Sequence, residues 1–90
     1  MTRRILKYPL KMTAGTQTVK IPANSEVVHF GVQGDNPGFF IWVDDVYGNI
    51  NYPVEKTFQV VGTGWHLPEG VKYISTTIVD GYVWHLFGEE

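Results

Sequence analysis

Hydrophobic residues along this chain alternate with polar ones or gather in short runs of β-branched and aromatic residues. Ten glycines and five prolines interrupt these runs, which leaves little room for a helix of ordinary length. Alternation bounded by such residues is typical of strands. The pattern predicts strands at residues 3–8, 16–21, 26–33, 39–45, 56–61, 71–79 and 82–87.

Turn residues predict how these strands are joined. Gly34–Gly38 links the third and fourth strands into a hairpin, because it combines Gly, Asp, Asn and Pro. Asp80-Gly81 predicts a two-residue type I′ hairpin between the last two strands. Pro9 lacks an amide donor, so the first strand is expected to end there and to lie at a sheet edge. Residues 47–54 are expected to form the one longer loop.

About seven short, mainly antiparallel strands predict an all-β fold, either a small β-sandwich or a partly open barrel. Ninety residues correspond to a single domain spanning residues 1–90, with a thin core. Residues 39–43 are apolar on both faces of their strand, which predicts burial on both sides or contact with another subunit. Three tryptophans, five tyrosines and five phenylalanines exceed the needs of such a core. This surplus predicts a homo-oligomer.

Charge and composition narrow the range of partners. The net charge of −2 gives no electrostatic basis for binding duplex nucleic acid or an anionic membrane. No cysteine is present, so disulfides and thiolate metal sites are excluded. No apolar run is long enough to span a bilayer, and no signal peptide follows the first arginines. We expect a cytoplasmic protein without a membrane partner.

The candidate chemistry is concentrated directly after the fifth predicted strand, where a hydroxyl, an indole and an imidazole stand beside two glycines. Glycine leaves the backbone bare and allows positive φ, and consecutive amides in such a bend can bind an anion. An aromatic ring can stack on a planar ligand, and a basic residue can neutralise phosphate. The predicted ligand-binding residues are Gly62, Thr63, Gly64, Trp65 and His66, joined by Arg4 and Tyr8 from one face of the first strand.

Structural roles remain open beside these functional ones. Trp65 would cap the core, contact a partner subunit or stack on a ligand. His29 and His85 lie in strands, where a lone histidine is most often a hydrogen-bonded structural residue. Asp44 and Asp45 are expected to end their strand as solvated residues, and as neighbours they point to opposite faces and make no acid–base pair.

Known motifs add no enzymatic signature. The histidine spacing predicts no metal site, and no nucleophile elbow, P-loop or dinucleotide fingerprint is present. We therefore expect a protein without a cofactor, a metal or catalytic residues. Catalysis would require a general acid and a general base near one another, and the sequence places none.

The chain resembles a widespread group of short all-β proteins encoded by bacteriophages. The resemblance spans nearly the whole chain and rests on segments 5–10, 19–22, 26–28, 40–44, 60–64 and 67–68. In that group a histidine directly follows the second glycine, whereas here Trp65 precedes His66. Proteins of this kind also look like the phage sponges that sequester nucleotide signals of bacterial immunity, known as anti-CBASS proteins. These are symmetric oligomers with ligand pockets at subunit interfaces.

This likeness implies immune evasion by capture of a small nucleotide, such as a cyclic dinucleotide, without turnover. Trp65 or a tyrosine would stack on the base, and Thr63, the Gly62–Gly64 amides and Arg4 would hold phosphate. The alternative is a phage structural or accessory protein, or a module that binds a host protein and takes no small molecule. In that case the aromatic surplus serves protein contacts.

Overall fold

The computed structural model describes residues 3–11, 15–35, 38–45 and 52–89, and every regular element among them is a strand. The seven strands are β1 (Arg4–Leu10), β2 (Thr16–Pro22), β3 (Ser25–Gly31), β4 (Phe39–Asp45), β5 (Pro53–Gly62), β6 (Val71–Val79) and β7 (Tyr82–Glu89). They form two antiparallel sheets, ordered β1-β4-β3 and β2-β5-β7-β6. The prediction of an all-β sandwich is confirmed, and the sheets do not close into a barrel.

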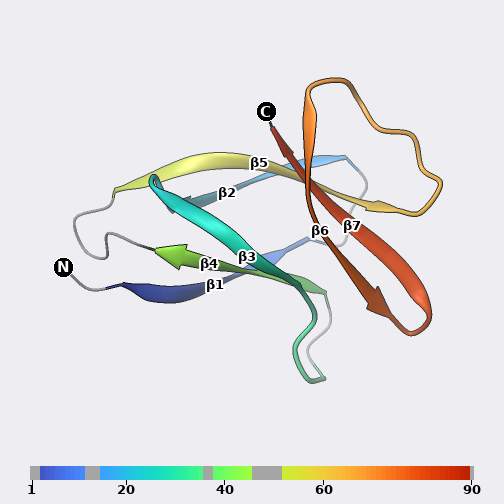
Figure 1. Cartoon of the computed structure of the whole chain (residues 1–90), viewed down its shortest axis with the longest axis horizontal. Coiled ribbons are helices and arrows are strands. Elements are labelled where there is room, and N and C mark those ends of the chain that lie inside the picture. The colour runs from blue at the N-terminus through green and yellow to red at the C-terminus, as the bar shows by residue number, and fades with distance from the viewer. Residues whose placement is uncertain (1–2, 12–14, 36–37, 46–51, 90) are drawn as a thin grey trace.

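The two sheets enclose one hydrophobic core. Alternation along each strand directs every second side chain inward, so both sheets contribute to it. The buried members are Leu10, Ile21, Phe30, Phe39, Ile41, Val43, Phe58, Val60 and Leu86. At the borders of the sandwich, β3 runs beside β6 and β1 beside β2 (Figure 1).

The predicted hairpins are present. In the β6–β7 turn, Asp80 has φ 51° and Gly81 has φ 81°, which are the two positive values that a type I′ loop requires. β3 pairs with β4, the central strand of its sheet. β1 pairs with β4 alone, so the edge position predicted from Pro9 is also confirmed.

Four strand boundaries differ from prediction by two or more residues, and β7 supplies one of them because it continues to Glu89. β1 continues through Pro9 to Leu10, because an edge strand does not need an amide donor on its open side. β3 ends at Gly31, two residues earlier than expected. β5 begins at Pro53, opposite Pro22, so the predicted 47–54 loop ends inside a strand, while its residues 47–51 lie outside the described part of the chain. No helix in the described ranges is long and apolar enough to cross a membrane.

Candidate functional site

A row of aromatic rings leads from the core to one end of the sandwich. Phe39 packs against Trp84 with ring centroids 5.5 Å apart, and Trp84 meets Trp65 edge-on at 5.8 Å and 86°. Each such contact contributes about 0.5–1.5 kcal/mol beyond the area it buries. Trp65 keeps 51% of its surface exposed. Its ring therefore caps the end of the core and still presents a free surface.

Gly62 makes this arrangement possible. A Cβ at this position would lie 3.0 Å from Cε2 and Nε1 of the Trp65 ring, tighter than nine in ten real Cβ contacts, so the indole would have to shift. The Trp65 amide donates to the Gly62 carbonyl at 3.2 Å, and Gly64 takes φ +90° to complete the bend. The two glycines thus serve different purposes: Gly62 gives room for the indole, and Gly64 supplies a backbone conformation that other residues rarely adopt.

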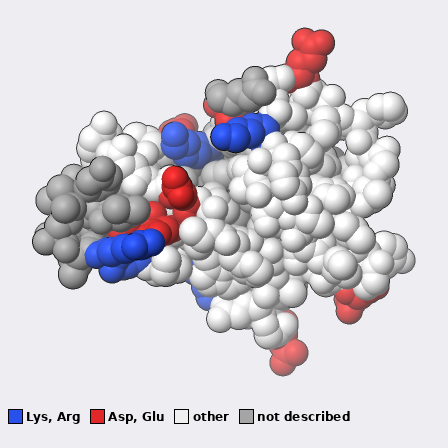
Figure 2. Space-filling view, viewed as in Figure 1, with Lys and Arg blue, Asp and Glu red and all other residues white. Residues whose placement is uncertain are grey.

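A cavity of about 540 Å³ lies beside the Trp65 ring. Its size falls in the range of small-molecule sites. The β5 end and the β6–β7 hairpin form it together, with Gly62, Thr63, Trp65, Gly81, Tyr82, Val83 and Trp84 as its lining. None of these seven residues is charged. On the face seen in Figure 2, the basic side chains lie at the left and upper middle of the molecule, whereas the β6–β7 hairpin lies at the right (Figure 1). We call this cavity the end pocket.

Only part of the predicted site comes together at the end pocket. Gly62, Thr63 and Trp65 line it, whereas Gly64 and His66 are exposed and lie outside its lining. Tyr82 and Trp84 belong to it, although the sequence prediction did not include them. The sequence did indicate that both residues follow the Asp80-Gly81 turn. It did not indicate that this hairpin lies next to the glycine bend, because that depends on the pairing of Gly62 with Trp84.

Arg4 and Tyr8 lie elsewhere. β1 pairs Arg4 with Asp45 at one end of the sheet and Leu10 with Phe39 at the other. At about 3.3 Å per residue, Arg4 is roughly 20 Å from the Phe39 end, where the aromatic row begins. Tyr8 packs against the core, and burial raises the pKa of its phenol. Within one protomer, neither residue shares the end pocket with Trp65.

The backbone amides of the glycine bend are largely engaged. The Thr63 amide donates to the Val83 carbonyl at 3.3 Å, and the Trp65 amide donates to Gly62. Two of the consecutive donors that an anion-binding bend needs are therefore used within the protein. The Thr63 hydroxyl, in contrast, contacts polar groups outside this bend.

Thr63 belongs to a chain of polar side chains on the outer face of the β2-β5-β7-β6 sheet. Its Oγ1 lies 2.9 Å from His85 Nε2, and His85 Nδ1 lies 2.9 Å from Thr76 Oγ1. Thr76 in turn meets the Tyr73 hydroxyl at 2.7 Å. The prediction that His85 is a hydrogen-bonded structural histidine is confirmed. His29 instead packs its ring against Trp42, with centroids 5.1 Å apart.

The hydrogen bonds of this chain run in one consistent direction. The Thr63 hydroxyl donates to the Val83 carbonyl at 3.2 Å, so its oxygen accepts from His85 Nε2–H. His85 Nδ1 then accepts from the Thr76 hydroxyl, which accepts from Tyr73. Every donor finds an acceptor when His85 is the neutral Nε2–H tautomer. The network therefore fixes the orientation and the tautomer of the His85 ring.

The adjacent aspartates are buried rather than solvated. Asp45 is fully buried and accepts from Arg4 Nε at 3.0 Å, and Asp44 is 7% exposed and accepts from Arg3 Nε at 3.0 Å. The expectation that both would end the strand in solvent is therefore wrong. Arg4, the first residue of β1, partners Asp45, and Arg3, the residue before β1, partners Asp44. The hydrogen bond from Arg3 lowers the pKa of Asp44. Among the described residues, no three His, Asp or Glu side chains are grouped to hold a metal ion.

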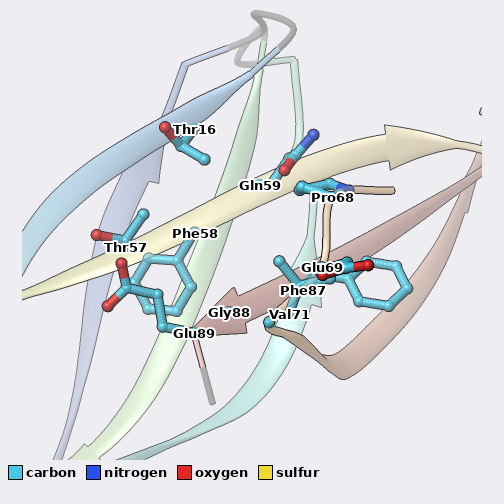
Figure 3. A pocket seen from close by; sticks show the side chains of 11 residues that line it. Thr16, Thr57, Phe58, Gln59, Pro68, Glu69, Val71, Phe87, Gly88 and Glu89 are labelled. Atoms are coloured by element: carbon cyan, nitrogen blue, oxygen red, sulfur yellow. The ribbon is translucent and has the colours of Figure 1, made fainter. Parts of the chain in front are cut away.

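A second cavity, of about 400 Å³, lies where the chain returns from Trp65 toward β6. Its lining comes from β2, β5, β7 and the residues before β6, as Figure 3 shows for Thr16, Gln59 and Pro68. The Oε1 atom of Gln59 is buried there without a hydrogen-bond partner in the described structure. Thr16 and Phe87 are the residues paired with Gln59 on the adjoining strands. We call this cavity the loop pocket. No sequence motif had pointed to it.

The fold and its sites define an open, seven-stranded antiparallel β-sandwich, in which the end pocket and the loop pocket have separate linings. The chain belongs to the family described as a domain of unknown function, DUF7352, whose model matches residues 1–90. No curated protein and no solved structure matches it.

Proposed function

We propose that this protein is a phage-encoded binding protein that captures a small nucleotide signal in its end pocket and does not transform it. The supporting observation is the pocket itself: half-exposed Trp65, held edge-on to Trp84 above bare Gly62, with Tyr82 on the facing hairpin. Base stacking on such a ring contributes about 1–3 kcal/mol per base. The resemblance to short phage proteins supports the source and the role in immune evasion.

The residues that line the pocket indicate which part of the nucleotide would enter it. Because it carries no charged residue, the base would enter and the phosphate would remain toward solvent. The Thr63 hydroxyl donates to the Val83 carbonyl, so it would have to exchange this bond to hold a phosphate. Arg4 would take part only from another subunit, since in its own protomer it pairs with Asp45 at the far end of β1. Affinity dominated by stacking is expected to depend only weakly on salt, unlike binding through several phosphate contacts.

Capture without turnover is supported by the lining of the end pocket, which contains no carboxylate, imidazole or amine side chain to serve as a general acid or base. Protein-bound nucleotide should therefore be recovered chemically intact.

Native mass spectrometry with a panel of cyclic mono- and dinucleotides tests the proposal. We expect the oligomer to gain whole ligand masses, and Trp65→Ala to abolish this gain. Trp42→Ala, in the outer face of the other sheet, is the matched control and should bind normally. Absence of any uptake by the wild-type protein, or equal uptake by the Trp65→Ala variant, would refute it.

A protein-binding role is the second candidate, favoured by the outer face of the β1-β4-β3 sheet. The Trp42 ring makes tilted contacts there with His29 and Phe40, with ring centroids 5.1 and 6.1 Å apart. Ile5 and Val28 of the same sheet are 56% and 53% exposed. A contact through this face, in a virion or with a host protein, would be lost in the Trp42→Ala variant and kept in Trp65→Ala. The same two variants therefore separate the two functions.

A further inference from the structure

A third cavity opens between the two sheets, at the border where β3 runs beside β6. A Cβ at Gly31 would lie 3.4 Å from Thr77 Oγ1, so the end of β3 approaches β6 closely. Toward their starts the two strands diverge (Figure 1), and a cavity of about 340 Å³ lies between the sheets there. Its lining combines apolar side chains with two lysines. We call this cavity the border pocket.

Apolar side chains form the inner wall of the border pocket. Ile21 and Phe58 belong to the buried core, whereas Val27 and Ile74 pack against that core and are only partly buried. Val27 lies on β3 and Ile74 on β6, so the two side chains come from different sheets. Because both line the cavity, they offer it aliphatic surface that an apolar part of a ligand would remove from water.

Two lysines stand on the face of the four-stranded sheet that is otherwise directed at the core. Lys56 is paired with Val19, which packs on the core, and directly paired residues share a face. Gly88 is paired with buried Phe58 on one side and with Lys72 on the other, so Lys72 also points toward the core side. Gly88 has no side chain, so β7 places nothing between the two lysines at this point.

The cations outnumber the carboxylates at this pocket. Glu89 is the remaining charged residue of the lining, and two lysines with one glutamate give a net charge of +1. Strand alternation directs the Glu89 side chain to the outer face of the sheet, where Figure 3 shows it beside Thr57. Within the described ranges the salt bridges are those of Arg3 and Arg4, and neither lysine has an anionic partner.

We propose that the border pocket binds a small amphipathic carboxylate, with its alkyl chain against Val27 and Ile74 and its head group at Lys56 and Lys72. Hydrogen bonds from an ammonium group to a carboxylate are stronger than neutral ones, and the aliphatic stem of a lysine can lie along an alkyl chain. The net charge of +1 matches a head group with one negative charge. The volume lies near the lower end of small-molecule sites, which suits a medium-chain acid rather than a long lipid.

Octanoate is the probe, followed by isothermal titration calorimetry and by amide chemical shifts of the labelled full chain. We expect saturable shifts at Val27, Lys72 and Gly88. Hexanoate should bind about tenfold more weakly, because it brings two fewer methylene groups to the aliphatic wall. Octanamide, which has the same chain and no charge, should bind much more weakly than octanoate. Added salt should weaken octanoate binding, since the ammonium groups lie at an exposed mouth.

Four variants test the role of the charges. Lys56→Met and Lys72→Met keep the aliphatic stem and remove the ammonium group, so each should weaken octanoate binding about threefold, and both together about tenfold. Lys20→Met, at an exposed position of β2 outside the lining, is the matched control and should have no effect. Glu89→Gln removes the opposing carboxylate and should strengthen binding about twofold.

The outcomes separate this proposal from the nucleotide site. The border pocket shares no lining residue with the end pocket, so Trp65→Ala should bind octanoate normally. Loss of octanoate binding in that variant would place the acid in the end pocket and overturn the proposal. Unchanged binding in the double lysine variant, or equal binding of octanamide, would also overturn it. Absence of any response to octanoate would show that the lysines only shield the open edges of β3 and β6.

The carboxylate could belong to a free acid or to the C-terminus of a peptide. N-acetyl-leucine distinguishes these sources, because it carries the same head group beside a peptide amide and a short apolar side chain. Binding comparable to that of hexanoate indicates that the mouth of the pocket admits a peptide terminus. Binding of the alkyl acids alone indicates a free acid.

Discussion

Replacing Gly62 with valine tests the architecture of the end pocket. A Cβ at position 62 would already lie 3.0 Å from the Trp65 ring, and the two methyl groups of valine would extend further into it. The backbone of Gly62 does not have positive φ, so the new side chain causes no backbone strain. Any loss of stability in Gly62→Val therefore comes from displacing the indole.

The size of this loss follows from what Trp65 contributes. A tryptophan buries at most about 250 Å², and Trp65 is 51% exposed, so roughly 100 Å² returns to water, worth about 2.5 kcal/mol as an upper value. Loss of the edge-on contact with Trp84 adds about 1 kcal/mol. Valine is favoured over glycine in a strand by about 1 kcal/mol. The net destabilisation expected is about 2 kcal/mol.

A double-mutant cycle provides the assay. Urea unfolding should show Gly62→Val destabilised by about 2 kcal/mol, with tryptophan fluorescence of the folded protein shifted to the red as the indole enters water. In a Trp65→Ala background the same substitution should be neutral or stabilising, because the strand preference remains and the clash is gone. If Gly62→Val costs the same with and without Trp65, the indole is not what requires glycine at this position.

The other predictions concern the remaining polar groups. Because the hydrogen bond from Arg3 lowers the pKa of Asp44, that stabilisation is complete above the unfolded value of about pH 4 and is lost as pH falls through the folded pKa. Asp44→Asn should therefore lose stability near neutral pH and show a shallower decline below about pH 4 in thermal melts. Nitrogen-15 spectra in alkaline buffer should show His85 as the Nε2–H tautomer, and Thr63→Val should remove this preference and cost about 1 kcal/mol in urea unfolding. Gln59→Met should stabilise the ligand-free protein by about 1 kcal/mol, because a buried unpaired acceptor is removed; a loss of stability would show that Gln59 is already satisfied.

Local chemistry predicted most of the strand layout. The type I′ turn at Asp80-Gly81 needs two positive φ values that few residue pairs supply, so the last hairpin followed from sequence alone. Pro9 likewise revealed an edge strand, since its missing donor is tolerated only there. These features depend on a residue's own backbone preferences, which are present in the sequence.

The fate of the two aspartates was less predictable. A pair of carboxylates at the end of an apolar strand is most often solvated, and nothing local distinguishes this pair from others. Their burial depends on Arg3 and Arg4, which come from a strand about forty residues away and meet them only through the β1–β4 register. A partner so distant in sequence becomes visible only when the strand order is known.

Register also accounts for the two features that sequence analysis missed. Thr63 and His85 were both noted, but as separate residues, because their contact requires β5 and β7 to be neighbours although β6 lies between them in the chain. Gln59 drew no attention, since a glutamine in a strand beside Phe58 and Val60 has the alternation of an ordinary solvated position. It is buried because residues 68–70 return over that face, and this return encloses the cavity as well. The position of residues 68–70 is a property of the tertiary fold, so neither the burial of the Gln59 oxygen nor the cavity could be predicted from the strand pattern alone.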